Sequence, residues 1–296
     1  MRKFFKVSFI SIVLIFALIG MAFTAVFVGM QFGLTNVRGT IEQRDSFFGK
    51  VPTISLKNAS SSNEKAEPIG NGCKEGLDQN KPCEWSETVQ WEVVKGGLSK
   101  DADVIKRVSS ETGVPARMIA AAVVPEQVRF FTDNREVFKR YFEPLKILAS
   151  LSQFSLGVSG IKQKTAADIE LYANDPTSVF YPGDGLAALV AYASSTDHDQ
   201  ELFNRLTDEK NHYYSYLYTA LYLKEIEMQW QRAGYKVGNR PDVLVTLFNL
   251  GFAASQPKAD PKAAGAAIVI GGEQYTFGTL GALFYHSDEI LEEFPR

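Results

Sequence analysis

Glu126 is the residue whose sequence neighbours best suit acid–base chemistry. It follows Pro125 at the end of the alanine-rich stretch 114–124. Pro115 favours the first turn of a helix, and Pro125 removes a backbone hydrogen bond, so we expect the helix to end near Pro125. Apolar neighbours and the negative end of a helix both disfavour an ionised carboxylate. Glu126 could then give a proton to a leaving oxygen; the alternative is an ordinary solvent-exposed glutamate.

A second candidate site is the glycine-rich stretch 155–166, Ser-Leu-Gly-Val-Ser-Gly-Ile-Lys-Gln-Lys-Thr-Ala. It places two glycines three residues apart and leads into a predicted helix that begins at Thr165. Glycines let backbone amides and carbonyls approach a ligand closely, as binding of the N-acetyl groups of an amino sugar would require. The alternative is a plain turn capped by Thr165. We expect ligand contacts from Ser155, Gly157, Ser159 and Gly160.

The elements that must position these residues are mostly helical. Apolar spacing and end signals predict helices over Lys100–Ser110, Asn134–Leu151, Gly183–Tyr192, Asn211–Trp230 and Pro241–Gly251, and a last one from Leu280. The glycine pair 271–272 separates Ala267–Ile270 from Gln274–Phe277, which predicts a small β hairpin. The predicted fold class is mainly α.

The N-terminal region has the properties of a membrane anchor. Residues 7–34 contain no charged side chain and are long enough as a helix to cross the ~30 Å core of a bilayer. Arg2, Lys3 and Lys6 precede them, so the positive-inside tendency leaves the N-terminus in the cytoplasm. Residues 1–34 are therefore predicted to be a cytoplasmic tip and a single transmembrane signal anchor in contact with lipid. The alternative is a cleaved signal peptide.

Residues 35–98 are predicted to form an extracytoplasmic linker, because apolar periodicity is weak and a polar tract follows residue 57. Cys73 and Cys83 are the only cysteines, and outside the cytoplasm they favour a disulfide worth about 2–3 kcal/mol for so short a loop. Trp85 and Trp91 suggest that the linker ends by packing onto the domain that follows, residues 99–296.

Composition excludes two classes of function. The net charge of −3 and the lack of a basic stripe argue against a nucleic-acid partner. The three histidines, His198, His212 and His286, are scattered and form none of the common metal-ligand spacings, so we expect no metal and no cofactor.

Three segments, taken in order, resemble the lysozyme-like lytic transglycosylases, the soluble-lytic-transglycosylase type related to goose lysozyme. They are Glu126 after an alanine-rich helix, the glycine-rich loop 155–166, and Leu-Phe-Asn-Leu-Gly at 247–251, which is similar to the Ala-Tyr-Asn-Ala-Gly helix end of that family. Tyr-Thr-Ala-Leu-Tyr-Leu-Lys at 218–224 also resembles the family helix before that motif. The resemblance covers residues 100–296.

The resemblance implies a lysozyme-like helical domain that cleaves peptidoglycan glycan strands between N-acetylmuramic acid and N-acetylglucosamine. Glu126 would protonate the bridging oxygen and then, as a base, help the muramyl 6-hydroxyl close a 1,6-anhydro ring. Phe248 and Asn249 would contact substrate together with the loop. The protein would then be a single-pass bacterial inner-membrane enzyme, with its catalytic domain facing the periplasm or cell wall.

Some residues depart from the family pattern. Gln127 stands where the family usually has Ser, Phe248 replaces Tyr, and Gly157 follows Glu126 by 31 residues, more than is common. These departures leave two alternatives: a non-catalytic peptidoglycan-binding scaffold of a wall-spanning assembly, or a lysozyme-like hydrolase. A hydrolase would usually need a second acid, for which Asp133, Glu136, Glu143 and Asp168 are candidates.

Overall fold

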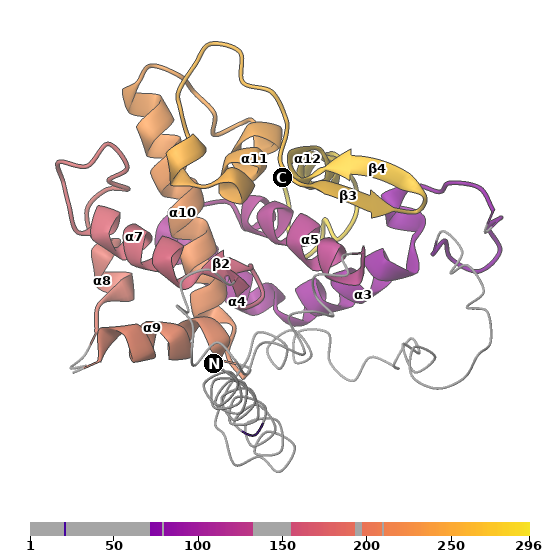
Figure 1. The fold of residues 1–296 in the computed structure, drawn as a ribbon, viewed down its shortest axis with the longest axis horizontal. Coiled ribbons are helices and arrows are strands. Elements are labelled where there is room, and N and C mark those ends of the chain that lie inside the picture. The colour runs from indigo at the N-terminus through magenta and orange to yellow at the C-terminus, as the bar shows by residue number, and fades with distance from the viewer. Residues whose placement is uncertain (1–20, 22–71, 79, 133–154, 193–196, 209) are drawn as a thin grey trace, which may run out of the picture.

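The structure is a computed structural model that describes residues 21, 72–78, 80–132, 155–192, 197–208 and 210–296 (Figure 1). The predicted anchor, apart from residue 21, and the predicted helix Asn134–Leu151 lie outside the described residues. Within the described part of the chain, no helix is both long and apolar enough to span a bilayer.

The described chain is mainly α-helical, which confirms the predicted class. Its helices are η2 (Trp85–Glu87), α3 (Val89–Lys100), α4 (Ala102–Thr112), α5 (Ala116–Thr132), α7 (Gln163–Ala173), α8 (Ala187–Val190), α9 (His198–Thr207), α10 (Tyr213–Arg232), α11 (Pro241–Leu250), η5 (Phe252–Ala254) and α12 (Phe277–His286).

Two small antiparallel hairpins complete the described fold. Strands β1 (Ser155–Leu156) and β2 (Ile161–Lys162) flank the glycine-rich turn, and β3 (Ala267–Ile270) pairs with β4 (Glu273–Thr276), with Ile268 opposite Tyr275. The second hairpin confirms the prediction from the glycine pair, and both glycines have positive φ, 64° and 81°. Helix α12 begins at Phe277 rather than Leu280, because the Thr276 side chain caps it through the Thr279 N–H.

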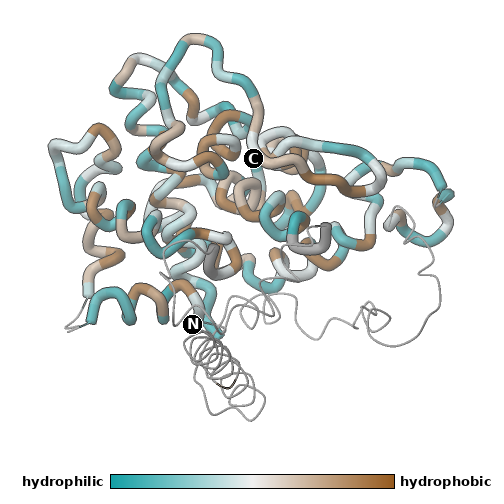
Figure 2. The backbone as a smooth tube through the Cα atoms, viewed as in Figure 1, coloured by the Kyte–Doolittle hydropathy of each residue, from teal (hydrophilic) through white to brown (hydrophobic). Residues whose placement is uncertain are grey.

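Helix α5 lies at the centre of the core. It packs against α3, α4, α10, α11 and α12, and its residues from Met118 to Val124 are at most 2% exposed. Helices α7, α8 and α9 lie on one side of α10, while α3 and the β3–β4 hairpin lie beyond α5 (Figure 1). Hydrophobic residues concentrate in the middle of the molecule and hydrophilic ones in the loops at its edge (Figure 2).

The prediction that a helix ends near Pro125 is wrong, because α5 continues through Pro125 to Thr132. Pro125 has no N–H to donate to the carbonyl of Ala121, one turn earlier. Gly281 of α12 lies so close to that carbonyl oxygen that a Cβ at Gly281 would be 2.7 Å from it. The helix persists because its buried face packs against five other helices, which offsets the loss of this one hydrogen bond. Glu126 consequently lies inside a helix and not at its C-terminal end.

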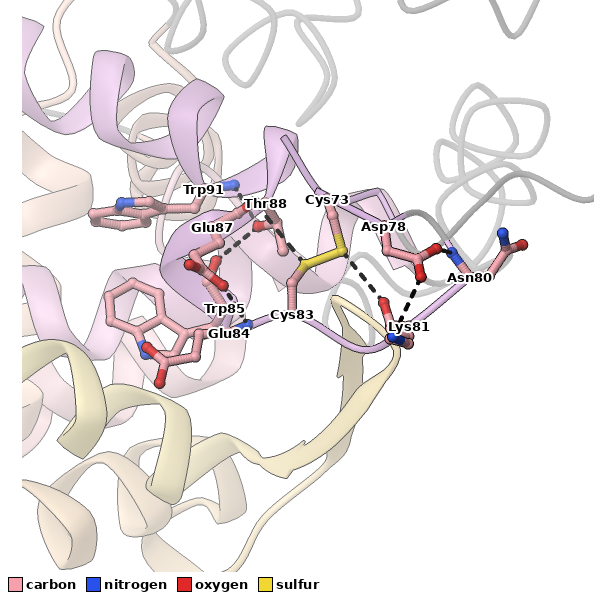
Figure 3. The surroundings of a disulfide bond; sticks show 10 residues. All are labelled: Cys73, Asp78, Asn80, Lys81, Cys83, Glu84, Trp85, Glu87, Thr88 and Trp91. Carbon is pink, nitrogen blue, oxygen red and sulfur yellow. Dashed lines mark hydrogen bonds and ion pairs between the residues drawn. A yellow bond between two sulfur atoms is a disulfide. The ribbon is translucent and has the colours of Figure 1, made fainter. Parts of the chain in front are cut away.

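The folded region begins earlier than predicted. Residues 72–98 were assigned to the linker, yet Trp91, Val94 and Leu98 are fully buried in the common core. Cys73 and Cys83 form a disulfide that closes the loop before η2 (Figure 3). The described domain therefore extends from residue 72 to residue 296.

The region between α7 and α10 also differs from the prediction. The helix expected over Gly183–Tyr192 is reduced to α8, because Gly183 and Gly185 adopt positive φ values of 117° and 84° that an α-helix does not use. Helix α9 was not predicted, although the Asp197 side chain caps it through the Gln200 N–H. Helix α7 starts at Gln163, two residues before the expected Thr165.

Glu225 on α10 is a fully buried acid, and neither of its carboxyl oxygens has a hydrogen-bond partner within the described structure. Burial raises the pKa of its carboxyl group well above 4.5, and the charge of Asp168 adds to the effect. The unfolded chain loses this proton near pH ~4.3, whereas the folded chain retains it to higher pH, so Glu225 lowers stability as the pH rises through this range.

We expect Glu225→Gln to raise the free energy of unfolding by about 1–3 kcal/mol at pH 7, because the variant has no carboxyl group to ionise. Near pH 3 the two proteins should be equally stable, since Glu225 is then protonated in both states. Urea denaturation at both pH values measures this difference. An equal effect of the substitution at pH 3 and pH 7 would contradict the assignment.

Candidate active site around Glu126

Glu126 is held inside α5 with its side chain almost completely covered. The residue is 4% exposed, and its Oε2 accepts a 2.6 Å hydrogen bond from Nη2 of Arg129, one turn further along the helix. The sequence around Glu126 predicted apolar neighbours and a helix end. The opposite charge was missed, although acidic and basic residues three apart on a helix commonly pair.

The β1–β2 turn packs directly on Glu126. A Cβ at Gly160 would lie 2.3 Å from Glu126 Oε1, so only glycine leaves room for the carboxylate. Gly157 and Gly160 both have positive φ, 70° and 65°, which glycine adopts without strain. The structure thus brings together Glu126 and one of the predicted loop residues, Gly160.

Two buried polar side chains fix this turn in place. Gln127 is fully buried, and its Nε2 donates a hydrogen bond to the carbonyl of Val158. The hydroxyl of Ser159 donates to the carbonyl of Ser215 on α10, over 3.0 Å. Ser159, predicted as a ligand contact, therefore anchors the turn to α10 in this structure. Ser155 pairs with Lys162 at the open end of the hairpin.

The predicted contacts on α11 have other partners. Asn249 accepts a 2.9 Å hydrogen bond at Oδ1 from the N–H of Ala266, and so holds the segment that leads into β3. Phe248 is 8% exposed and packs beside Tyr222, with ring centroids 5.3 Å apart. Within the described residues, no hydrogen bond or ring contact joins Phe248 or Asn249 to Glu126.

No protein-family model, curated protein or solved structure matches this chain. The possible chemistry of the site therefore follows from the side chains and backbone groups around Glu126. One carboxylate faces a backbone turn at Oε1 and a guanidinium at Oε2. Such a group can accept a proton or, once protonated, donate one. Among the described residues, no group of three His, Cys, Asp or Glu side chains is arranged to hold a metal ion.

Gln127 and Arg129 are the residues that sequence reasoning did not assign to the site. Gln127 was noted only as a departure from a family pattern. Its role depends on a carbonyl 31 residues away in the sequence, so no local pattern could have indicated it. Arg129 could have been found from its spacing to Glu126.

We expect Gly160→Ala to displace the Glu126 carboxylate, because the added methyl group overlaps Oε1 and the residue keeps an unfavourable positive φ. The free energy of unfolding should fall by about 2–4 kcal/mol, of which about 1 kcal/mol is due to φ alone. Gly113→Ala is the matched control, since Gly113 has φ 72° and nothing lies within 4 Å of its Cβ position. Equal losses in the two variants would show that Gly160 and Glu126 are not in close contact.

Proposed function

We propose that this chain is a membrane-anchored peptidoglycan lytic transglycosylase of lysozyme-like fold, with Glu126 as its single general acid and base. The observation that supports the proposal most is the contact between Glu126 and the turn at Gly160. The resemblance predicted a catalytic glutamate beside a glycine-rich loop from two separate stretches of sequence. A mainly helical chain with small hairpins is compatible with that fold.

In this proposal, protonated Glu126 gives its proton to the oxygen that bridges N-acetylmuramic acid and N-acetylglucosamine. The glycosidic bond breaks, and an oxocarbenium-like muramyl residue remains. The ionised Glu126 then takes the proton from the 6-hydroxyl of the same sugar, whose oxygen bonds to the anomeric carbon. One carboxylate suffices for both steps, because the attacking hydroxyl belongs to the substrate.

Arg129 has a different effect on each of these two steps. Its guanidinium stabilises the carboxylate and therefore suits the second step, in which Glu126 is ionised. Arg129 gives no such support to the protonated form that the first step uses, and its described hydrogen bond to Glu126 is made to Oε2 alone.

The proposed location is the bacterial inner membrane. Residues 7–34 would anchor the chain in the bilayer, with the N-terminus in the cytoplasm. The domain from residue 72 onward would then face the periplasm or cell wall, where disulfides such as Cys73–Cys83 persist.

The test is to incubate the full chain with purified peptidoglycan and to analyse the released muropeptides by mass spectrometry. Products that end in 1,6-anhydro-muramic acid are expected. Products one water heavier would identify a hydrolase instead. An absence of released products would overturn the proposed activity.

A non-catalytic peptidoglycan-binding scaffold is the second candidate. The Glu126–Arg129 ion pair and the 4% exposure of Glu126 favour it, because a catalytic acid must reach its substrate. A folded chain that sediments with purified peptidoglycan and releases no muropeptides would support the scaffold.

A further inference from the structure

A pocket outside the Glu126 site lies between α7, α8 and the start of α9. Its volume is about 530 Å³, which is within the range of small-ligand sites. Ala167 and Leu171 of α7 and Val190 of α8 form apolar walls, and Leu171 is 62% exposed. The pocket therefore offers aliphatic surface to a ligand.

Glu170 supplies a fixed carboxylate at this pocket. Its Oε1 accepts hydrogen bonds from the hydroxyl of Tyr192, at 2.6 Å, and from the hydroxyl of Tyr218. Burial raises the pKa of both tyrosines, so both remain protonated donors. Because both donors use Oε1, Oε2 is the carboxylate oxygen left to accept a hydrogen bond from a ligand.

A second polar group in this pocket is Asn174, the C-cap residue that follows α7. Its Nδ2 donates to the backbone carbonyl of Glu170, which leaves its Oδ1 as an acceptor. The pocket thus presents one acceptor from the last turn of α7 and one from its C-cap residue.

Arg205 is a cationic side chain that packs against the lining residues from outside the lining, and its Nη atoms are used by two of their backbone carbonyls. Arg205 is 7% exposed and lies 3.9 Å from the ring centre of Tyr192. Its Nη atoms donate to the carbonyls of Val190 and Ala191, over 2.6 and 2.9 Å. None of the described lining residues is Lys or Arg.

We propose that this pocket binds a primary ammonium group carried on a short aliphatic chain, with Glu170 Oε2 as the anionic acceptor. The ammonium has only donors, which matches the two acceptors, and the aliphatic chain covers the apolar walls. Two sources carry this chemistry: a diamino acid in a wall stem peptide, and a lysine side chain of a protein.

The experiment titrates the full chain with Nα-acetyl-lysine amide by ligand-observed NMR. Nα-acetyl-norleucine amide is the neutral comparison, since it retains the aliphatic chain without the ammonium. We expect the lysine probe to bind and the norleucine probe to bind about tenfold more weakly. Equal binding of the two probes, or no binding of the lysine probe, would overturn the proposal.

Variants locate the binding site. Glu170→Gln keeps an oxygen to accept the tyrosine hydroxyls but removes the charge, and should weaken the lysine probe about tenfold. Ala187→Phe places a ring in the pocket and should also reduce binding. Glu273→Gln is the matched control, because Glu273 is exposed on β4, and it should bind like the unmodified chain. Equal binding by Glu170→Gln and the unmodified chain would contradict the role of Glu170.

Two further probes distinguish the two sources. One is a stem peptide that ends in a diamino acid, and the other is a lysine-containing peptide that has no cell-wall component. Preferential binding of the stem peptide points to the wall, and preferential binding of the lysine peptide points to a protein. The ammonium pocket does not require Glu126 to be catalytic, so binding by a chain that releases no muropeptides would still support it.

Discussion

Glu126→Gln is expected to lower the rate of anhydro-muropeptide release by about 10²–10⁴-fold, the range for loss of a general acid–base group. Glutamine has nearly the same volume, and its amide oxygen can still accept the hydrogen bond from Arg129. The variant should therefore fold normally, bind the glycan and fail only in proton transfer. Mass spectrometry of products under identical conditions measures the loss.

Glu273→Gln serves as the control here too, since it removes one exposed carboxylate away from Glu126. Circular dichroism and the midpoint of thermal unfolding establish that both variants are folded. Release at the unmodified rate by Glu126→Gln would show that the proton comes from another group. Such a result would leave the transglycosylase reaction intact and remove Glu126 from it.

Arg117→Met is expected to lower the free energy of unfolding by about 3–5 kcal/mol. Arg117 is fully buried in α5, and burial lowers the pKa of its guanidinium. It donates five hydrogen bonds to backbone carbonyls at and beyond the end of α12, those of Phe284, Tyr285, Ser287, Glu289 and Phe294. Methionine fills much of the same space but leaves all five carbonyls without this donor.

The control for this stability measurement is Arg107→Met. Arg107 lies on the surface of α4 and pairs with Glu111 one turn away, so its loss should cost much less than the loss of Arg117. Denaturant unfolding of the three proteins gives both differences. A loss below 1 kcal/mol for Arg117→Met would mean that water replaces the guanidinium at these carbonyls and that the C-terminal segment is not held by Arg117.

Local sequence signals correctly predicted the elements whose ends are set by a proline or a glycine. Pro241 marks the start of α11, and the glycine pair 271–272 marks the β3–β4 turn, because each acts within its own few residues. Pro125 misled the prediction, because α5 is held by packing against distant segments such as α12, whose Gly281 lies 156 residues further along the chain. Likewise, nothing near Trp91 indicates that Phe284 would pack beside it, with ring centres 5.7 Å apart.

The candidate site was predictable only in part, for the same reason. Sequence patterns suggested Glu126 and Gly160 as site residues. Their contact, however, depends on how the β1–β2 hairpin packs against α5. Asn249 was nominated by a motif, and its described bond to Ala266 is a tertiary contact that the motif does not encode. The partners of these groups are therefore tertiary contacts, which a local sequence pattern does not specify.

The loop closed by Cys73 and Cys83 also determines how the domain would respond to mechanical force. Tension applied through the chain before residue 72 can pass across the sulfur–sulfur bond to Cys83 without stretching residues 74–82. Cys83 donates its N–H to the carbonyl of Gly271, so the load then reaches the tip of the β3–β4 hairpin. Reduction of the disulfide would leave the backbone hydrogen bonds of Gly72 with Val89 and of Lys74 with Glu87 as the described link that carries this load into the core.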